Sequence, residues 1–164
     1  MARRNSASDI ALGGVLASLA VAITCIGGLI PASTFVCPMI SILILAVVLK
    51  RSGNRSAWAW YGAVAILGVL LSPDKEAAAV FSFLGYYPIL KPKLDSLPLR
   101  WLWKILLFNA AILLMYWLLM HLFGMAQLLH EFEEMGLLLT AITLAMGNAT
   151  FFLLDRLLSI RFKV

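Results

Sequence analysis

Three consecutive charged residues, Asp74, Lys75 and Glu76, interrupt an otherwise apolar chain. Carboxylates and an ammonium group at the mouth of a helix bundle can orient a polar solute. The acidic residues also have a structural interpretation, because Ser72 or Asp74 can cap the following helix and acids in its first turn favour its positive end. We therefore predict Lys75 and Glu76 as solute contacts, with helix capping as the alternative for this cluster.

Two amide side chains, Asn109 and Asn148, lie within long apolar segments. Inside hydrocarbon such a group must be hydrogen-bonded, so it faces other helices or a water-filled cavity. One interpretation is direct contact with a solute. The other is a hydrogen bond between the two segments, Asn109 with Asn148. Both residues are candidate solute contacts on this evidence.

Two further pairs have the residue types for a metal site or a disulfide. His130 and Glu134 have helical i, i+4 spacing, and Cys25 and Cys37 are expected at similar depth on two neighbouring segments. No third ligand is fixed by spacing in either case. A solvated acidic loop and two buried free thiols are the alternatives. We predict no metal site, and the sequence assigns no role to these four residues or to His121.

The sequence lacks the common catalytic motifs. It contains no Gly-x-Ser-x-Gly, no His-Glu-x-x-His and no glycine-rich phosphate loop ending in Gly-Lys-Ser/Thr. We therefore predict no catalytic residues, no cofactor and no enzymatic activity. Any ATP hydrolysis that serves this protein would belong to another subunit.

The composition identifies lipid as the solvent of this chain. Of its 164 residues 63% are hydrophobic and 13% charged, and the mean hydropathy is +0.98. That is more apolar side chain than one water-soluble core buries. The net charge of +5 comes from residues at the ends of apolar runs, so membrane topology explains it better than nucleic-acid binding.

We predict an all-α, polytopic membrane protein that forms one domain over residues 1–164. A membrane-spanning helix needs about 20 mainly apolar residues. Six segments meet or approach this length, and the first is interpreted as a retained span rather than a cleaved signal peptide. The predicted spans are 9–30, 34–49, 56–72, 76–90, 101–123 and 135–160.

The distribution of basic residues predicts the orientation. With these six spans, every Lys and Arg except Lys75 falls on one side of the membrane. Because basic residues concentrate in cytoplasmic loops, both termini are predicted to be cytoplasmic. Asp155 and Arg156, near the end of the last span, are expected to form an ion pair at the cytoplasmic interface.

The first span carries small residues at intervals of three or four: Ala7, Ala11, Gly14, Ser18 and Ala22, with Gly13 and Ala17 beside them. Small side chains let helices approach closely in a membrane, where apolar contact alone gives little drive for association. The partner of this face is either the chain's own bundle or a separate protein. The spacing does not distinguish the two.

The chain resembles the substrate-binding (S) components of energy-coupling factor (ECF) transporters, small six-helix membrane proteins that capture a vitamin or a metal. The resemblance covers the size, the six spans, the cytoplasmic ends and the small-residue first helix. Gly13-x-x-x-Ala17 stands where that family has Ala-x-x-x-Ala. The segments PDKEAAAVFSFLGYYPILKPKL and LFNAAILL also resemble a bacterial membrane-protein family akin to these components.

The resemblance implies a transport subunit in the bacterial cell membrane. It would bind a small-molecule solute from outside, between its helices. It would dock through Gly13 and Ala17 onto a transmembrane coupling subunit, and two ATPase subunits would drive its reorientation. The alternative is a non-transporting membrane scaffold or accessory protein, in which the polar and small residues only hold helices together.

Overall fold

The computed structural model describes residues 6–27, 33–121 and 126–161, and for most residues between 126 and 140 it describes the backbone alone. Throughout these ranges the regular structure is helical, without strands, which confirms the predicted all-α class. The helices are α1 (Ser6–Gly27), α2 (Ser33–Ser52), α3 (Asn54–Leu71), α4 (Lys75–Leu84), α5 (Tyr87–Asp95), α6 (Arg100–His121) and α7 (Ala126–Arg161).

Four stretches of helix are long and apolar enough to cross a membrane. They lie in α1, α2, α6 and the second part of α7, and their bounds are Ser8–Ile26, Phe35–Ser52, Arg100–His121 and Ala141–Ile160. The chain is therefore an all-helical protein with four candidate membrane-spanning helices. The predicted spans 56–72 and 76–90 correspond to α3 and to the α4–α5 pair, which are not among these four.

The segment predicted as one span at 76–90 consists of two helices. The break follows Gly85, where an added Cβ would lie 2.5 Å from the carbonyl oxygen of Phe81 and 3.0 Å from a ring carbon of Tyr61, so this position favours glycine. Pro88 lies in the first turn of α5, where its fixed φ and missing N–H are tolerated. Because α5 continues to Asp95, Lys91 belongs to this helix and not to the connecting segment.

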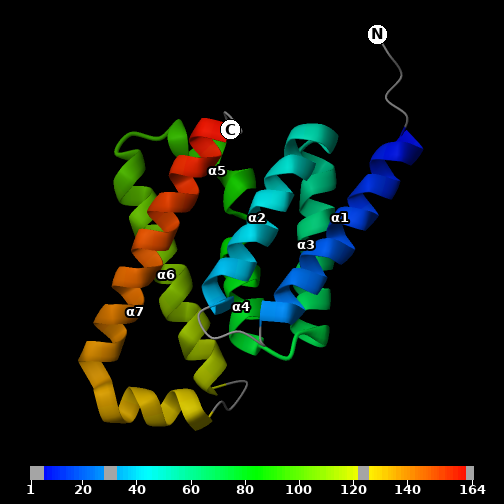
Figure 1. Ribbon diagram of the computed structural model, residues 1–164. Helices are drawn as coiled ribbons and strands as arrows, with labels where there is room; N and C mark the ends of the chain where they lie inside the picture. Colours follow the sequence, from blue (N-terminus) through cyan, green and yellow to red (C-terminus); the bar gives the residue numbers. More distant parts are fainter. Residues whose placement is uncertain (1–5, 28–32, 122–125, 162–164) are drawn as a thin grey trace.

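The last helix starts earlier than predicted and changes direction at Gly136. This glycine has φ 46° and ψ −121°, a conformation that residues with a Cβ rarely adopt. Figure 1 shows the result: the first part of α7 runs crosswise at one end of the bundle, and the second part runs alongside α6. Only the second part corresponds to the predicted span 135–160.

Helix α2 lies at the centre of the bundle and packs against α1, α3, α4, α5 and α7. On one side of it lie α1 and α3, and on the other α6 and α7 (Figure 1). Among the described side chains, the shared core contains aliphatic and aromatic residues from all seven helices. Its largest fully buried members include Ile42, Leu45, Phe81, Tyr87, Phe108 and Met115.

The basic connections gather at one end of the bundle, which we call the basic end. There α1, α3 and α6 begin and α2, α5 and α7 finish (Figure 1). Exposed basic residues at this end are Lys50, Arg51, Arg55, Lys93, Arg100 and Arg156. Lys75 lies at the opposite end, where α4 begins. The arrangement of the helices thus agrees with the charge pattern in the sequence.

Exposed tryptophans mark both ends of α6. Trp101 and Trp103 lie in its first turn and Trp117 near its end. At about 1.5 Å per residue, Trp103 and Trp117 are about 21 Å apart along the helix axis. Tryptophan concentrates at the two interfaces of a bilayer. This spacing supports α6 as a membrane-crossing helix.

Candidate functional site: polar helix pairs and a buried ion cluster

The charged residues at the α3–α4 connection have structural partners. Asp74 is the N-cap of α4, and its Oδ1 accepts a hydrogen bond of 3.0 Å from the backbone N–H of Ala77. The predicted capping role is therefore confirmed. Lys75 Nζ donates a hydrogen bond of 2.8 Å to the carbonyl of Val69, in the last turn of α3. A cation is favourable there because that helix end carries partial negative charge.

Glu76 links α4 to α6. The hydroxyl of Tyr116 donates a hydrogen bond of 2.5 Å to Glu76 Oε1. Tyr116 is buried, whereas Glu76 is half-buried at the end of the bundle opposite the basic end. A hydrogen bond to a carboxylate is stronger than one between neutral groups. This contact fixes the α4–α6 spacing at that end.

The two predicted amide side chains are paired with each other. Asn148 Nδ2 donates to Asn109 Oδ1 at 2.9 Å and to the carbonyl of Leu144 at 2.7 Å. Asn109 Nδ2 donates at 3.0 Å to the carbonyl of Ile105, one turn earlier in α6. The predicted interhelical hydrogen bond is confirmed, and solute contact by these amides stays a prediction.

These residues form two separate contacts along α6. Asn109 and Tyr116 are two helical turns apart, about 10 Å along the axis. One contact joins α6 to α7 and the other joins α6 to α4, while Lys75 bonds to α3. The structure therefore does not gather the four predicted residues Lys75, Glu76, Asn109 and Asn148 into one polar pocket.

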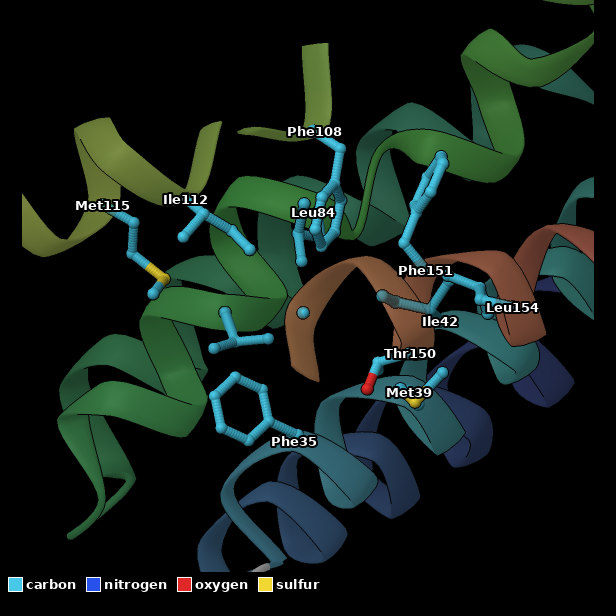
Figure 2. A pocket seen from close by; sticks show the side chains of 12 residues that line it. Phe35, Met39, Ile42, Leu84, Phe108, Ile112, Met115, Thr150, Phe151 and Leu154 are labelled. Atoms are coloured by element: carbon cyan, nitrogen blue, oxygen red, sulfur yellow. The ribbon is translucent and has the colours of Figure 1, made fainter. Parts of the chain in front are cut away.

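A small apolar cavity lies where α2, α4, α6 and α7 meet (Figure 2). Its volume of about 20 Å³ is enough for one water-sized molecule, and an apolar cavity of this kind stays dry. Thr150 is its one polar lining residue, and none of the four predicted solute contacts lines it. The apolar walls include Phe35, Met39, Ile112, Met115 and Phe151.

Gly147 brings α7 close to α6 beside this cavity. A Cβ at Gly147 would lie 2.7 Å from Ile112 Cδ1 and 3.3 Å from Phe108 Cε1. The first distance is shorter than a normal contact between carbon atoms. Glycine at this position thus permits the close helix packing that leaves so little space in the interior.

A second polar cluster, which we call the ion cluster, lies at the basic end and consists of Tyr87, Lys91, Asp95, Lys104 and Asp155. Asp155 Oδ1 accepts hydrogen bonds from Tyr87 at 2.5 Å, Lys91 at 2.6 Å and Lys104 at 3.0 Å. Asp95 pairs with the same two ammonium groups, at 3.1 Å to Lys91 and 2.5 Å to Lys104. The cluster joins α5, α6 and α7.

The charges of the ion cluster balance. Lys91 is 1% exposed, Lys104 2% and Asp155 5%, and the two cations lie among two carboxylates. Buried charges in a membrane protein need such pairing. For Asp95, burial alone would raise the pKa, but hydrogen bonds from Lys104 and Lys91 outweigh burial and lower the pKa of this carboxyl below its ordinary value. The two ammonium groups and the two carboxylates of the cluster are therefore partners of one another.

The sequence prediction for Asp155 was wrong. Arg156 is exposed, whereas Asp155 faces inward and bonds to α5 and α6. Helical spacing indicates the inward orientation of Asp155, because this residue lies four positions after Phe151 and three before Leu158, and both of these are buried. The partners were missed because α5 was expected to end before Lys91.

The small residues of α1 point in two directions. Trp60 Nε1 of α3 donates a hydrogen bond of 2.9 Å to the carbonyl of Gly13, and Ala17 packs against the core. These two predicted interface residues therefore face partly into the chain's own bundle. A neighbouring row faces outward and is exposed; its members are Ala11, Gly14, Ser18 and Ala22.

The remaining residues considered in the sequence analysis are the two cysteines, His121, His130 and Glu134. Cys25 and Cys37 are free and partly buried. His121 Nδ1 lies 2.9 Å from the carbonyl of Trp117, and the two rings stack. The side chains of His130 and Glu134 lie outside the described residues, so the solvated acidic loop expected there, with a cation site as the alternative, stays a prediction. Comparison of the chain with protein-family models, characterised proteins and solved structures gives no match.

Proposed function

We propose that this chain is the solute-binding membrane subunit of an importer of the ECF type, seen in a closed form. The observation that carries the proposal is the outward row of small residues on α1. Nothing in the described structure lies within 4 Å of a Cβ placed on Gly14. Contact with lipid does not require small side chains, whereas another helix can pack closely against them. The row therefore supports docking onto a separate transmembrane coupling subunit.

The proposed topology has six crossings. They are α1, α2, α3, the segment 76–90 in α4 and the start of α5, α6 and the part of α7 after Gly136, with the basic end, including Asp95, in the cytoplasm of a bacterial cell. The tryptophans of α6 and the gathering of exposed basic residues at one end support this arrangement. In this orientation Lys75 and Glu76 lie at the outer mouth of the bundle.

Solute binding in this proposal requires α6 to move. The cavity in the closed form is too small for a vitamin-sized molecule. Separation of Tyr116 from Glu76 and of Asn109 from Asn148 would free a carboxylate, a hydroxyl and two amides to face a solute. The ion cluster would meanwhile keep the basic end closed. No chemical change to the solute is involved, and two ATPase subunits would supply the energy.

The test is affinity purification of the tagged chain from native membranes. We expect a transmembrane coupling subunit and two ATPases to co-purify, and Gly14→Trp to abolish their recovery. Gly14 is the better position than Ala17 because its replacement leaves the chain's own core intact. The matched control is Leu113→Trp, an exposed position on α6, which should leave recovery unchanged. Absence of ATPases from wild-type preparations would overturn the proposal.

A non-transporting membrane scaffold is the second candidate. Two observations favour it: each predicted solute contact already has a partner within the chain, and the cavity where α2, α4, α6 and α7 meet is small and apolar. The two functions differ in their response to solutes. A panel of vitamins and metal ions should include one that raises the melting temperature of a transport subunit, whereas no member of the panel should stabilise a scaffold.

A further inference from the structure

A groove on the bundle surface follows the α5–α6 connection and the first turns of α6. Arg100, Trp101, Leu102 and Ile105 line it, together with Asp95 at its inner edge. Arg100, Leu102 and Ile105 are exposed, so the groove presents one cation beside an apolar wall. Neither the predicted solute contacts nor the outward row on α1 belongs to it.

Among the described residues, Arg100 is the cation in this groove without a counterion. Lys91 and Lys104 are both held between Asp95 and Asp155, so the ion cluster is neutral and offers no charge to a ligand. Within the described part of the chain, Arg100 makes no ion pair. The groove between α1, α2 and α3 differs, because its cation Arg51 lies 3.5 Å from Asp9.

The wall of the groove is held in place. Trp101 stacks on Phe152 of α7, with ring centroids 5.8 Å apart and an interplanar angle of 28°. Its other neighbour is Lys104, whose Nζ lies 5.5 Å from the ring centroid of Trp101. A tryptophan fixed at this position lies at the headgroup level of a bilayer that α6 crosses. Arg100 precedes it at the start of the helix, where the helix end adds partial positive charge.

From this combination we infer that the groove binds an anionic phospholipid. The headgroup phosphate would pair with the guanidinium of Arg100, and an acyl chain would follow Leu102 and Ile105 toward the membrane interior. A phospholipid fits because it carries a negative charge next to hydrocarbon, as the groove presents a cation next to an apolar wall. Basic pockets at the cytoplasmic ends of membrane helices bind acidic headgroups in this manner. The inference is independent of solute transport.

The test is native mass spectrometry of the full chain purified in a mild detergent with phosphatidylglycerol or phosphatidylcholine. We expect the wild-type chain to retain phosphatidylglycerol preferentially, and Arg100→Gln to lose most of that preference. Arg100→Lys should keep a part of it, since the charge remains. Arg55→Gln removes an exposed cation from the same end of the bundle and should retain the preference, which makes it the matched control.

A second, independent variant fills the groove with a larger side chain. Ile105→Trp should weaken lipid retention while leaving Arg100 in place. Because Ile105 is exposed, the melting temperature of this variant without lipid should stay near that of the wild-type protein. Equal retention of phosphatidylglycerol by the wild type and Arg100→Gln would overturn the inference. So would equal losses in Arg100→Gln and Arg55→Gln. Stabilisation by glycerol 3-phosphate as strong as that by phosphatidylglycerol would identify a small-anion site instead of a lipid groove.

Discussion

The ammonium group of Lys91 lies 2.6 Å from the carboxylate of Asp155, 64 residues later in the sequence. This contact joins α5 to the end of α7, and Lys104 brings α6 to the same carboxylate. Farther along α6 there are two separate polar contacts, Asn109 with Asn148 near the middle of the helix and Tyr116 with Glu76 toward the opposite end. The helices of the bundle are therefore joined by ion pairs at the basic end and by hydrogen bonds farther along α6.

The first prediction concerns charge balance in the ion cluster. Asp155→Asn leaves Lys91 and Lys104 with one carboxylate, and an uncompensated buried charge typically destabilises by about 3–5 kcal/mol. We expect a large fall in the thermal unfolding midpoint of the protein in detergent. The double variant Asp155→Asn with Lys104→Gln restores neutrality and should recover part of the loss. Arg156→Gln, which removes an exposed neighbouring charge, is the control and should change little.

The second prediction concerns pH. The folded-state pKa of Asp95 is lower than its ordinary value, because its bonds to Lys104 and Lys91 outweigh the effect of burial. Its contribution to stability is therefore complete above the unfolded pKa of about 3.9 and is lost as pH falls through the folded value. The melting temperature of the wild type should fall below about pH 4. Asp95→Asn should be less stable at pH 7 and should show a smaller decrease on acidification; parallel pH profiles would contradict this assignment.

The third prediction concerns the hydrogen bond between Asn109 and Asn148. A double-mutant cycle with Asn109→Leu and Asn148→Leu isolates their coupling from the separate effects of each replacement. Hydrogen bonds between membrane helices are worth about 0.6 kcal/mol on average and up to about 1.7 kcal/mol. We expect a coupling energy in this range from unfolding measurements. Additive effects would show that each amide is held by its own helix carbonyl instead.

The sequence predicted the helical class and the gathering of basic residues at one end, because composition and charge distribution depend little on tertiary contacts. It also predicted the Asp74 cap and the Asn109–Asn148 bond, where a polar group needed a partner and few were available. These successes share one physical reason: a polar side chain in an apolar environment has few ways to be satisfied.

The ion cluster and the helix break were not predicted, because they depend on packing. Lys91 and Lys104 stand in a basic stretch that looks like an ordinary membrane-flanking linker, but Lys91 lies inside α5, which extends to Asp95, and Lys104 lies on the buried face of α6. The crowding at Gly85, beside the break, comes partly from Tyr61 of another helix. Spacing along the sequence does not contain such contacts between distant segments.

The last prediction concerns Gly147 and the close approach of α6 and α7. Alanine is the better helix former, so Gly147→Ala would stabilise an unconstrained helix by up to about 1 kcal/mol. Here the new Cβ would lie 2.7 Å from Ile112 Cδ1, and overpacking of this kind costs about 1–3 kcal/mol. We therefore expect a net loss of thermal stability. Ile112→Val removes the obstructing Cδ1, so adding it to Gly147→Ala should restore stability. Gly14→Ala, with open space around its Cβ, should be neutral or stabilising, and a similar response at both glycines would contradict the close α6–α7 contact.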